Sequence, residues 1–444
     1  MSHWQLIPSV ILFALCGLPR GGNSASLAER IAAAAPGATI HVESGLHPGP
    51  VTIDKPLTLI GETGAKILGD GKGNVVTIKA DNVTLRGFQI SDSGLNLSND
   101  NAAVFVAGNH VTIEDNKIEE SLHGIYLKKV TDCRVIGNRI RGKTSLKTET
   151  KSAEQTLTAG IGELCEVPLN ENERGNGIHQ WNCERNLIAS NEVSETRDGI
   201  YFSFTNHTRV ESNWVHNVRY GLHYMYSDDD VFENNVFNDN AAGAAIMFSR
   251  NIIIRANQFL DNRGSRAYGI LFQSDDFVHV ENNVLRNNAV GFSFQQAIGF
   301  VVKGNEVSGN YIGFRFYGNS DNNSFSENRF TRNLHPIDAD GAGTNNRWAV
   351  DGVGNFWGGE ETVDLNHDGI GDLPHRELDL FGPMRRSFPT VAFLSGSPIV
   401  KLLRFANERA AIPGLEAIED PAPLTADFWQ IRARGVLPHD RVRQ

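Results

Sequence analysis

The chain has 444 residues, of which 40% are hydrophobic and 21% are charged, so it can fold into one large domain or two smaller ones and shows no bias towards disorder. Its 44 glycines and its frequent asparagines weaken helix interiors, which disfavours a helical bundle. A formal net charge of -11 does not provide the positive charge that attracts nucleic acid or anionic lipid, so we expect no nucleic-acid partner.

Residues 1–25 are predicted to be a secretory signal peptide. An apolar run from Leu6 to Leu18 is followed by small residues up to Ala25. The run is shorter than a membrane-spanning helix, and a short membrane anchor or a lipid-modified cysteine is the alternative. Export predicts a periplasmic location if the source is a Gram-negative bacterium. In such an oxidising compartment, Cys133, Cys165 and Cys183 allow one disulfide and one free thiol.

A spacing of 22 residues organises the chain that follows a short predicted capping helix from Leu27 to Ala35. After irregular early coils, a glycine followed by an apolar residue recurs at Gly124, Gly177, Gly199, Gly221, Gly243, Gly269, Gly291 and Gly313. An asparagine recurs with nearly the same spacing at Asn116, Asn138, Asn191, Asn213, Asn235, Asn257, Asn283, Asn305 and Asn328. Two columns in register indicate a structural repeat.

The runs within each repeat are short and alternate apolar with polar residues, which is typical of strands and not of helices. A strand of this length cannot bury its apolar face alone, but one coil per repeat stacks equivalent strands into parallel sheets. We therefore predict an all-β fold, a right-handed parallel β-helix with coils of about 22 residues, over residues 26–360. A helical C-terminal tail is expected to follow it.

The repeat is interrupted near residues 143–175, where Lys, Thr, Glu and Ser dominate the composition. Gly124 and Gly177 are 53 residues apart, which corresponds to two coils plus nine residues or to one coil that carries a long loop. We favour the loop.

Outward-facing positions can be assigned because strand side chains alternate between the two faces of a sheet. Counting from each recurring glycine, positions +1 and +3 are apolar and face the core, so positions +2 and +4 face outward. This places His223 beside Met225, and Met247 directly above Met225 on the next coil, with His179 two coils earlier. Thioether and imidazole groups suit Cu(I), so we predict a copper site at these four residues. The alternatives are an apolar patch for a protein partner and methionines packed under a loop.

Residues 361–390 form an Asp- and Gly-rich region with a second candidate site. Asp364, Asn366, Asp368 and Asp372 occupy positions 1, 3, 5 and 9 of a calcium-binding loop, with glycine at position 6. Position 12 is His375, so the usual bidentate glutamate is missing. The sequence predicts a calcium site there, and a hydrogen-bonded turn without metal is the alternative.

Residues 391–444 are predicted to form a helical tail. Ser397 and Pro398 begin an amphipathic helix, with Ile399, Leu402, Leu403 and Ala406 on one face. This helix either closes the open end of the β-helix or docks on a partner.

β-Helices often carry enzymes that act on polysaccharides, so a carbohydrate-active or carbohydrate-binding protein is the alternative function. Such enzymes need acidic and basic residues together on one outward face. The acidic runs Asp228-Asp229-Asp230 and Asp275-Asp276 lie at strand ends, where turn-forming aspartates are expected, and no matching basic column accompanies them. We therefore expect a protein that is not an enzyme.

Several longer motifs match a known family. The runs Gly175-Asn-Gly-Ile-His-Gln-Trp, Arg219-Tyr-Gly-Leu-His-Tyr-Met and Asp368-Gly-Ile-Gly-Asp resemble the NosD family of accessory proteins in nitrous-oxide reductase maturation. The resemblance implies a periplasmic β-helix attached to an ABC-type ATPase and a membrane permease, which helps to assemble the copper sites of nitrous-oxide reductase. It implies a copper chaperone and the reductase as exchange partners. The resemblance does not specify the metal ligands, so their assignment depends on the outward columns alone.

Overall fold

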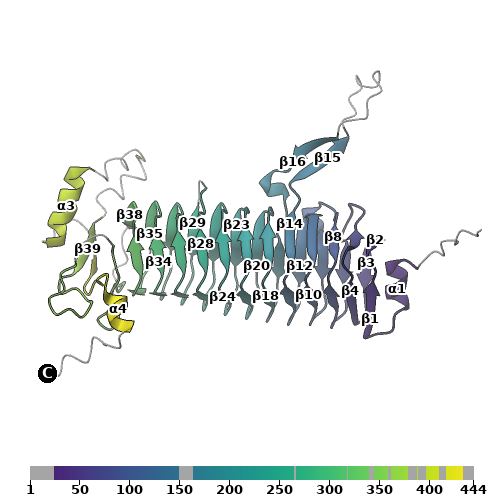
Figure 1. Ribbon diagram of the computed structural model, residues 1–444, viewed down its shortest axis with the longest axis horizontal. Coiled ribbons are helices and arrows are strands. Elements are labelled where there is room, and N and C mark those ends of the chain that lie inside the picture. Colours follow the sequence, from purple (N-terminus) through teal and green to yellow (C-terminus); the bar gives the residue numbers. More distant parts are fainter. Residues whose placement is uncertain are drawn as a thin grey trace, which may run out of the picture.

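The computed structural model describes residues 25–149, 164–264, 267–317, 319–339, 345–358, 362–378, 388, 397–409 and 417–433. The described chain winds into a long solenoid whose walls are three parallel sheets of 12 strands each (Figure 1). Consecutive strands of one coil belong to different sheets, and each strand pairs with its equivalents in the neighbouring coils. This is the predicted right-handed parallel β-helix. The predicted signal peptide lies almost entirely outside the described residues.

The strands of the three walls follow one another in chain order. The first sheet contains β1 (Ala38–Val42), β4 (Leu57–Gly61), β7 (Thr84–Arg86), β10 (Thr112–Glu114), β13 (Arg134–Ile136), β18 (Leu187–Ala189), β21 (Arg209–Glu211), β24 (Val231–Glu233), β27 (Ile253–Arg255), β30 (His279–Glu281), β33 (Val301–Lys303) and β36 (Ser324–Ser326). The second contains β2 (Gly45–Pro48), β5 (Ala65–Leu68), β8 (Gln89–Ser91), β11 (Lys117–Ser121), β14 (Arg139–Gly142), β19 (Glu192–Ser194), β22 (Trp214–His216), β25 (Val236–Asn238), β28 (Gln258–Leu260), β31 (Val284–Arg286), β34 (Glu306–Ser308) and β37 (Arg329–Thr331). The third contains β3 (Val51–Ile53), β6 (Val76–Ile78), β9 (Ala102–Val106), β12 (His123–Lys128), β17 (Ile178–Trp181), β20 (Asp198–Ser203), β23 (Tyr220–Met225), β26 (Ala242–Met247), β29 (Tyr268–Gln273), β32 (Val290–Gln295), β35 (Ile312–Tyr317) and β38 (His335–Ala339).

The recurring glycines stack on the third sheet, where neighbouring coils approach closely. A Cβ atom added at Gly243 would lie 2.5 Å from the carbonyl oxygen of Gly269 and 2.8 Å from the ring of Phe259. The same contact with the next coil recurs at Gly199 and Gly221. Glycine is required at this column because any side chain would collide with backbone atoms of the neighbouring coil.

The recurring asparagines form a continuous hydrogen-bonded ladder inside the solenoid. Each side-chain oxygen accepts from the backbone N–H and the side-chain amide of the preceding asparagine, and the amide also donates to backbone carbonyls. The Asn235 Nδ2 to Asn257 Oδ1 distance is 2.9 Å, and both side chains are fully buried. The ladder therefore satisfies backbone groups that each turn would otherwise leave unpaired in the core. Both predicted columns are confirmed.

The interruption of the repeat is an insertion within one coil, as predicted. β12 pairs directly with β17, so Ile125 lies opposite Ile178 and no complete coil intervenes. Part of the inserted segment forms an antiparallel hairpin of β15 (Ser145–Glu149) and β16 (Leu164–Pro168), which projects from the side of the solenoid (Figure 1). Residues 150–163 lie outside the described chain.

The N-terminal end of the solenoid is closed by the predicted capping helix, α1 (Leu27–Ala33). The helix begins with a capping box, in which Ser26 accepts from the backbone of Glu29 and the Glu29 carboxylate accepts from the backbone of Ser26. Leu27 and Ile31 are buried against the first coil. The helix therefore covers the apolar end of the core.

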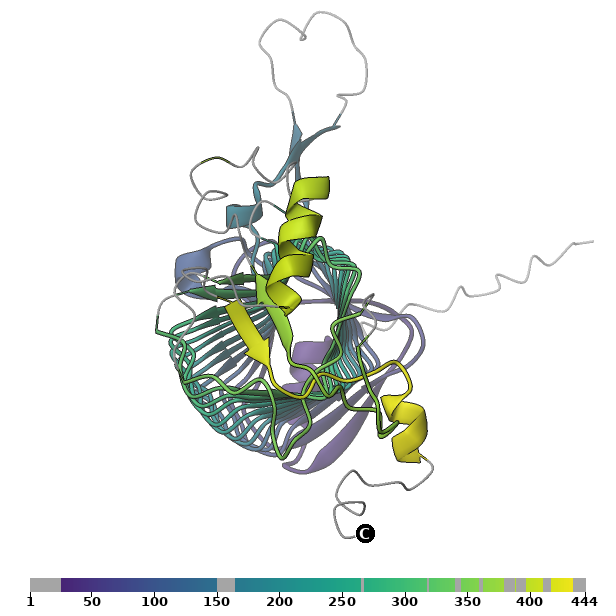
Figure 2. The same ribbon diagram turned by 90° about the vertical axis from the view of Figure 1, so that its left-hand side faces the viewer.

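The C-terminal end is closed by a small cap that the sequence predicted only in part. The expected helix is present as α3 (Pro398–Arg409), and a further helix, α4 (Phe428–Ala433), follows. An antiparallel pair of β39 (His375–Leu378) and β40 (Ala417–Asp420), which was not predicted, lies across the end of the coils beside α3 (Figure 2).

Asp420 joins this cap to the asparagine ladder. It is fully buried, and its Oδ2 atom accepts from the backbone N–H of Asn355 (2.7 Å) and the indole of Trp357 (2.9 Å). Asn355 belongs to the ladder because its side chain accepts from Asn328. It is the last asparagine, since its own backbone N–H donates to Asp420. The carboxylate thus takes the place of a further asparagine and ends the ladder.

Candidate metal site

The four predicted copper ligands lie on the outer face of the third sheet. Positions +1 and +3 are buried in the core, as Ile200 and Phe202 illustrate. Met225 on β23 pairs directly with Met247 on β26, and both side chains are half-buried. Neighbouring strands are about 4.8 Å apart, so the two methionines are direct neighbours in one outward column. The predicted stacking of the methionine pair is confirmed.

An exposed aromatic stack runs alongside the methionine pair. Phe204, Tyr226 and Phe248 directly follow position +4 in three successive coils, and each side chain is at least 41% exposed. The rings stack nearly parallel, with centroids 5.3 Å and 5.1 Å apart. Exposed aromatic groups of this kind mark surfaces that contact other proteins. This aromatic stack fits both interpretations of the methionine pair, the copper site and the surface for a protein partner.

His223 lies two residues before Met225 and is held by Asp198. Its Nδ1 atom donates to Asp198 Oδ2 at 2.8 Å, and Arg219 donates to both carboxylate oxygens at 2.8 Å. Burial acts to raise the pKa of Asp198, but the hydrogen bonds from His223 and Arg219 outweigh it, and the pKa lies below the ordinary value of aspartate. A charged carboxylate is therefore maintained beneath the imidazole.

His179 belongs to a different cluster on the same face. Its ring stacks on Tyr126 at 4.2 Å, contacts Tyr201 at 4.4 Å and meets the edge of His123 at 5.2 Å. Tyr201 lies between His179 and His223 in the column. Burial, together with the charges of nearby groups, lowers the pKa of His179 well below its ordinary value. The structure thus groups His179 with His123 and not with the methionine pair.

His123 is expected to make the protein less stable in mild acid. Burial lowers its pKa to about 4, although Asp100 acts in the opposite direction. The unfolded chain takes up a proton at this residue near pH 6.5, whereas the folded chain does so only near pH 4. The free energy of unfolding should therefore fall between pH 6.5 and 4, by on the order of 3 kcal/mol from this residue. Urea unfolding across this range measures the effect.

A His123→Gln variant is the control for this pH dependence. It cannot take up the proton, so its stability should fall less steeply with decreasing pH than that of the parent protein. Equal slopes for the two proteins would contradict the assignment.

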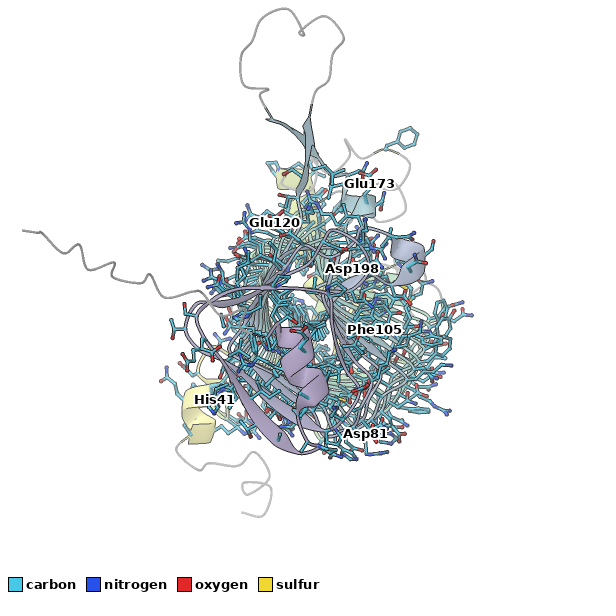
Figure 3. All side chains as sticks on the ribbon, turned by 90° about the vertical axis from the view of Figure 1, so that its right-hand side faces the viewer. His41, Asp81, Phe105, Glu120, Glu173 and Asp198 are labelled. Carbon is cyan, nitrogen blue, oxygen red and sulfur yellow. The ribbon has the colours of Figure 1, made fainter. Side chains whose placement is uncertain are left out.

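Three residues of this face, Asp198, Arg219 and His123, were not predicted from the sequence. The alternation rule assigned only positions +1 to +4, and Asp198 directly precedes its column glycine. Its buried carboxylate nevertheless contacts the outward-facing His223. An aspartate directly before Gly199 and an arginine two residues before Gly221, in the adjacent coil, are the signal that could have indicated them. Figure 3, which views the coils from the N-terminal end, shows Asp198 on the same wall of the solenoid as Phe105.

The predicted calcium loop lies in the C-terminal cap, and its carboxylates bind the loop's own backbone. Asp364 accepts from the backbone N–H groups of Asp368 (3.3 Å) and Gly369 (2.9 Å). Asp372 accepts from Leu365 at 2.6 Å. Among the described residues, no three His, Cys, Asp or Glu side chains gather closely enough to hold a metal ion. These contacts match the alternative of a hydrogen-bonded turn, and calcium binding stays a prediction.

The acidic runs at residues 228–230 and 275–276, which the sequence assigns to turns, contain carboxyl groups with structural hydrogen bonds. Asp230 and Asp275 are fully buried and accept hydrogen bonds from backbone N–H groups of Thr208 and Ser249. Burial raises the pKa of both carboxyls well above the ordinary value. Both side chains therefore stabilise turns.

The buried cysteines are free thiols. Cys133 and Cys183 are both buried and unpaired, and burial raises the pKa of Cys133 to about 12. Both sulfurs donate to backbone carbonyls of the preceding coil, Cys133 to Gly108 and Cys183 to Leu127. These thiols contribute to packing in the core.

Comparison with known structures shows the fold. The A-module of the mannuronan C-5 epimerase AlgE4 from Azotobacter vinelandii superimposes with a TM-score of 0.53, covering 71% of this chain and 91% of that chain at 12% identity. The A-module of AlgE6 from the same organism gives 0.52, covering 76% and 94% at 14% identity. Likeness at this level of identity concerns the β-helix alone.

Related sequences show the family to which the chain belongs. Residues 162–361, which include the methionine pair, match the family model of a class described as periplasmic copper-binding protein (NosD). The chain is 31% identical over 397 residues to a probable ABC transporter binding protein NosD of Pseudomonas aeruginosa, with 86% of each chain covered. It is 29% identical over 398 residues to the protein of the same name from Stutzerimonas stutzeri, covering 86% of this chain and 85% of that one. The chain therefore belongs to the NosD family.

Proposed function

We propose that this protein works in the periplasm with an ABC-type ATPase and a membrane permease to deliver Cu(I) during assembly of the copper sites of nitrous-oxide reductase. A copper chaperone is the donor and the reductase is the acceptor. The proposal is supported by the family, whose description is periplasmic copper binding, and by the names of the two relatives, which are ABC transporter binding proteins. It assigns the protein no catalytic step.

The observation that carries the proposal is the paired methionines. Met225 and Met247 lie side by side on an outward face. His223, which is on the same strand as Met225, is oriented by its hydrogen bond to Asp198. Two thioethers and one neutral imidazole are soft and borderline ligands that favour Cu(I) over Mg or Ca. Three protein ligands leave a coordination position open, as transfer of the ion to a partner requires. His179 is not needed in this set.

Competition for Cu(I) against a chromophoric chelator tests the proposal directly. The purified mature protein should bind one Cu(I) ion, and cells that lack the protein should produce a copper-deficient reductase. Binding to uronate polymers without Cu(I) binding would instead support the carbohydrate alternative.

The C-terminal helix supplies the surface that we propose for the permease. Among the described residues, no helix is long and apolar enough to cross a membrane. On α3, Val400 is 4% exposed, whereas Ile399 is 71% and Leu402 is 66% exposed. The helix therefore packs through one side and leaves apolar side chains uncovered on the other. Leu403, at 38% exposure, extends this face.

The double variant Ile399→Asp and Leu402→Asp should fold normally, because both side chains are exposed, and should no longer co-purify with the permease. Buried apolar contacts contribute about 25 cal/mol per Å², so two charges in their place should abolish a modest interface. Leu365→Asp is the matched control, since Leu365 is 78% exposed and lies elsewhere in the cap. If the double variant still co-purifies, α3 serves only as an end cap.

A further inference from the structure

His223 makes a single hydrogen bond to a side chain that has no contact with solvent. Asp198 on β20 is fully buried and lies in the coil before His223. Its Oδ2 atom accepts from His223 Nδ1 at 2.8 Å. Because a charged carboxylate can only accept hydrogen bonds, the Nδ1 atom of His223 must carry the proton in this contact.

The tautomer of a neutral imidazole decides which nitrogen can bind a metal ion. When Nδ1 carries the proton, the lone pair is on Nε2, which points to the opposite side of the ring. Asp198 pairs in register with Tyr220, three residues before His223, whereas Met225 lies two residues after it. The nitrogen with the lone pair therefore faces away from the Asp198 carboxylate, which lies in the preceding coil, whereas Met225 is on the strand of His223 itself and Met247 is in the following coil.

The carboxylate is itself held in one orientation. Arg219 donates from Nε to Asp198 Oδ1 and from its terminal nitrogen to Oδ2, both at 2.8 Å. The guanidinium also stacks on the ring of Tyr220 at 4.7 Å, and Tyr220 meets the His223 ring edge to face at 5.1 Å. Tyr201 contacts the imidazole from the preceding coil at 5.0 Å. The ring is thus held by contacts with two tyrosines and by the hydrogen bond to Asp198.

We propose that Asp198 is a positioning residue that holds His223 as the Nδ1-protonated tautomer and presents its Nε2 atom to Cu(I) beside Met225 and Met247. The inference rests on the proposed function and identifies how the imidazole of that site is prepared before the ion arrives. A carboxylate behind a metal-binding histidine typically contributes about 10- to 100-fold in metal affinity.

The first measurement is made on the copper-free full-length protein and needs no variant. Two-bond correlation of ring protons with ¹⁵N in histidine-labelled protein distinguishes the two neutral tautomers. His223 should carry its proton on Nδ1. A proton on Nε2 would overturn the proposal, even if the protein binds copper elsewhere.

The second measurement uses Asp198→Asn. An asparagine has only one oxygen, so it cannot accept from both nitrogens of Arg219 and from His223 in the observed geometry. Its amide group then faces either Arg219 or His223, and the Nε2-protonated tautomer of His223 should become populated. Affinity for Cu(I) should fall about 10- to 100-fold. An unchanged tautomer together with unchanged affinity would overturn the proposal.

Asp230→Asn is the matched control, because Asp230 is an equally buried carboxyl in the next coil that bonds to Tyr224 and not to a histidine. It should change neither the tautomer nor the affinity. The copper-free tautomer also separates this inference from the proposed function. If His223 is protonated on Nδ1 but loss of the methionines leaves Cu(I) affinity unchanged, the copper site is wrong while the role of Asp198 on the imidazole stands.

Discussion

Replacing Met225 and Met247 together by leucine is expected to weaken Cu(I) binding by at least about 100-fold. The change removes two of three proposed ligands, whereas loss of an outer hydrogen bond alone typically costs 10- to 100-fold. Leucine keeps the volume of methionine and lacks its sulfur, and such exchanges usually cost less than about 1.5 kcal/mol of stability. Competition with a chromophoric chelator measures the affinity, and thermal unfolding shows whether the fold is retained.

Gln273→Leu is the matched control for this experiment. Gln273 pairs with Met247 in the same outward column, one coil further along, so the substitution introduces leucine on the same surface without removing a sulfur. It should leave Cu(I) affinity unchanged. If the double methionine variant also keeps its affinity, the pair is ordinary packing or belongs, with the exposed stack at Phe204, Tyr226 and Phe248, to a surface that contacts a partner protein.

Replacing Asn257 by alanine is expected to destabilise the solenoid by about 3–5 kcal/mol. Its side-chain oxygen accepts from the backbone and the side chain of Asn235, and its amide donates to the backbone carbonyl of Phe232. Alanine would remove the partner of the Asn235 backbone N–H and the amide that donates to Phe232, at about 1–3 kcal/mol for each buried group, and the Asn235 amide would keep only its bond to Val210. The midpoint of urea unfolding should fall accordingly.

Gln258→Ala separates the loss of the ladder from the loss of an amide side chain as such. Gln258 is the next residue and is exposed on the surface, so its replacement should change stability by less than about 0.5 kcal/mol. A similarly small effect of Asn257→Ala would mean that water or a shifted neighbour replaces the missing hydrogen bonds, and the ladder would not be a major source of stability.

The sequence by itself determined the length of each coil and most of the columns of residues that stack from coil to coil. When each coil has the same length, residues 22 apart become cross-strand neighbours, so the spacing of Gly199 and Gly221, or of Asn213 and Asn235, translates directly into stacked columns. The pairing of Met225 with Met247 follows from the same register. The insertion before Gly177 was also predictable, because the columns resume in register after it.

Only the tertiary structure decided the contacts that do not repeat. Asp198 reaches His223 through a side-chain conformation at the start of a strand, where the alternation of faces no longer specifies direction. His123 meets the edge of the His179 ring, although the register pairs His179 with Tyr126 and not with His123, so ring packing decides this contact. Asp420 ends the asparagine ladder from a strand 65 residues beyond Asn355. Such contacts depend on where a unique segment folds back onto the coils, and a periodic pattern contains no information about that position.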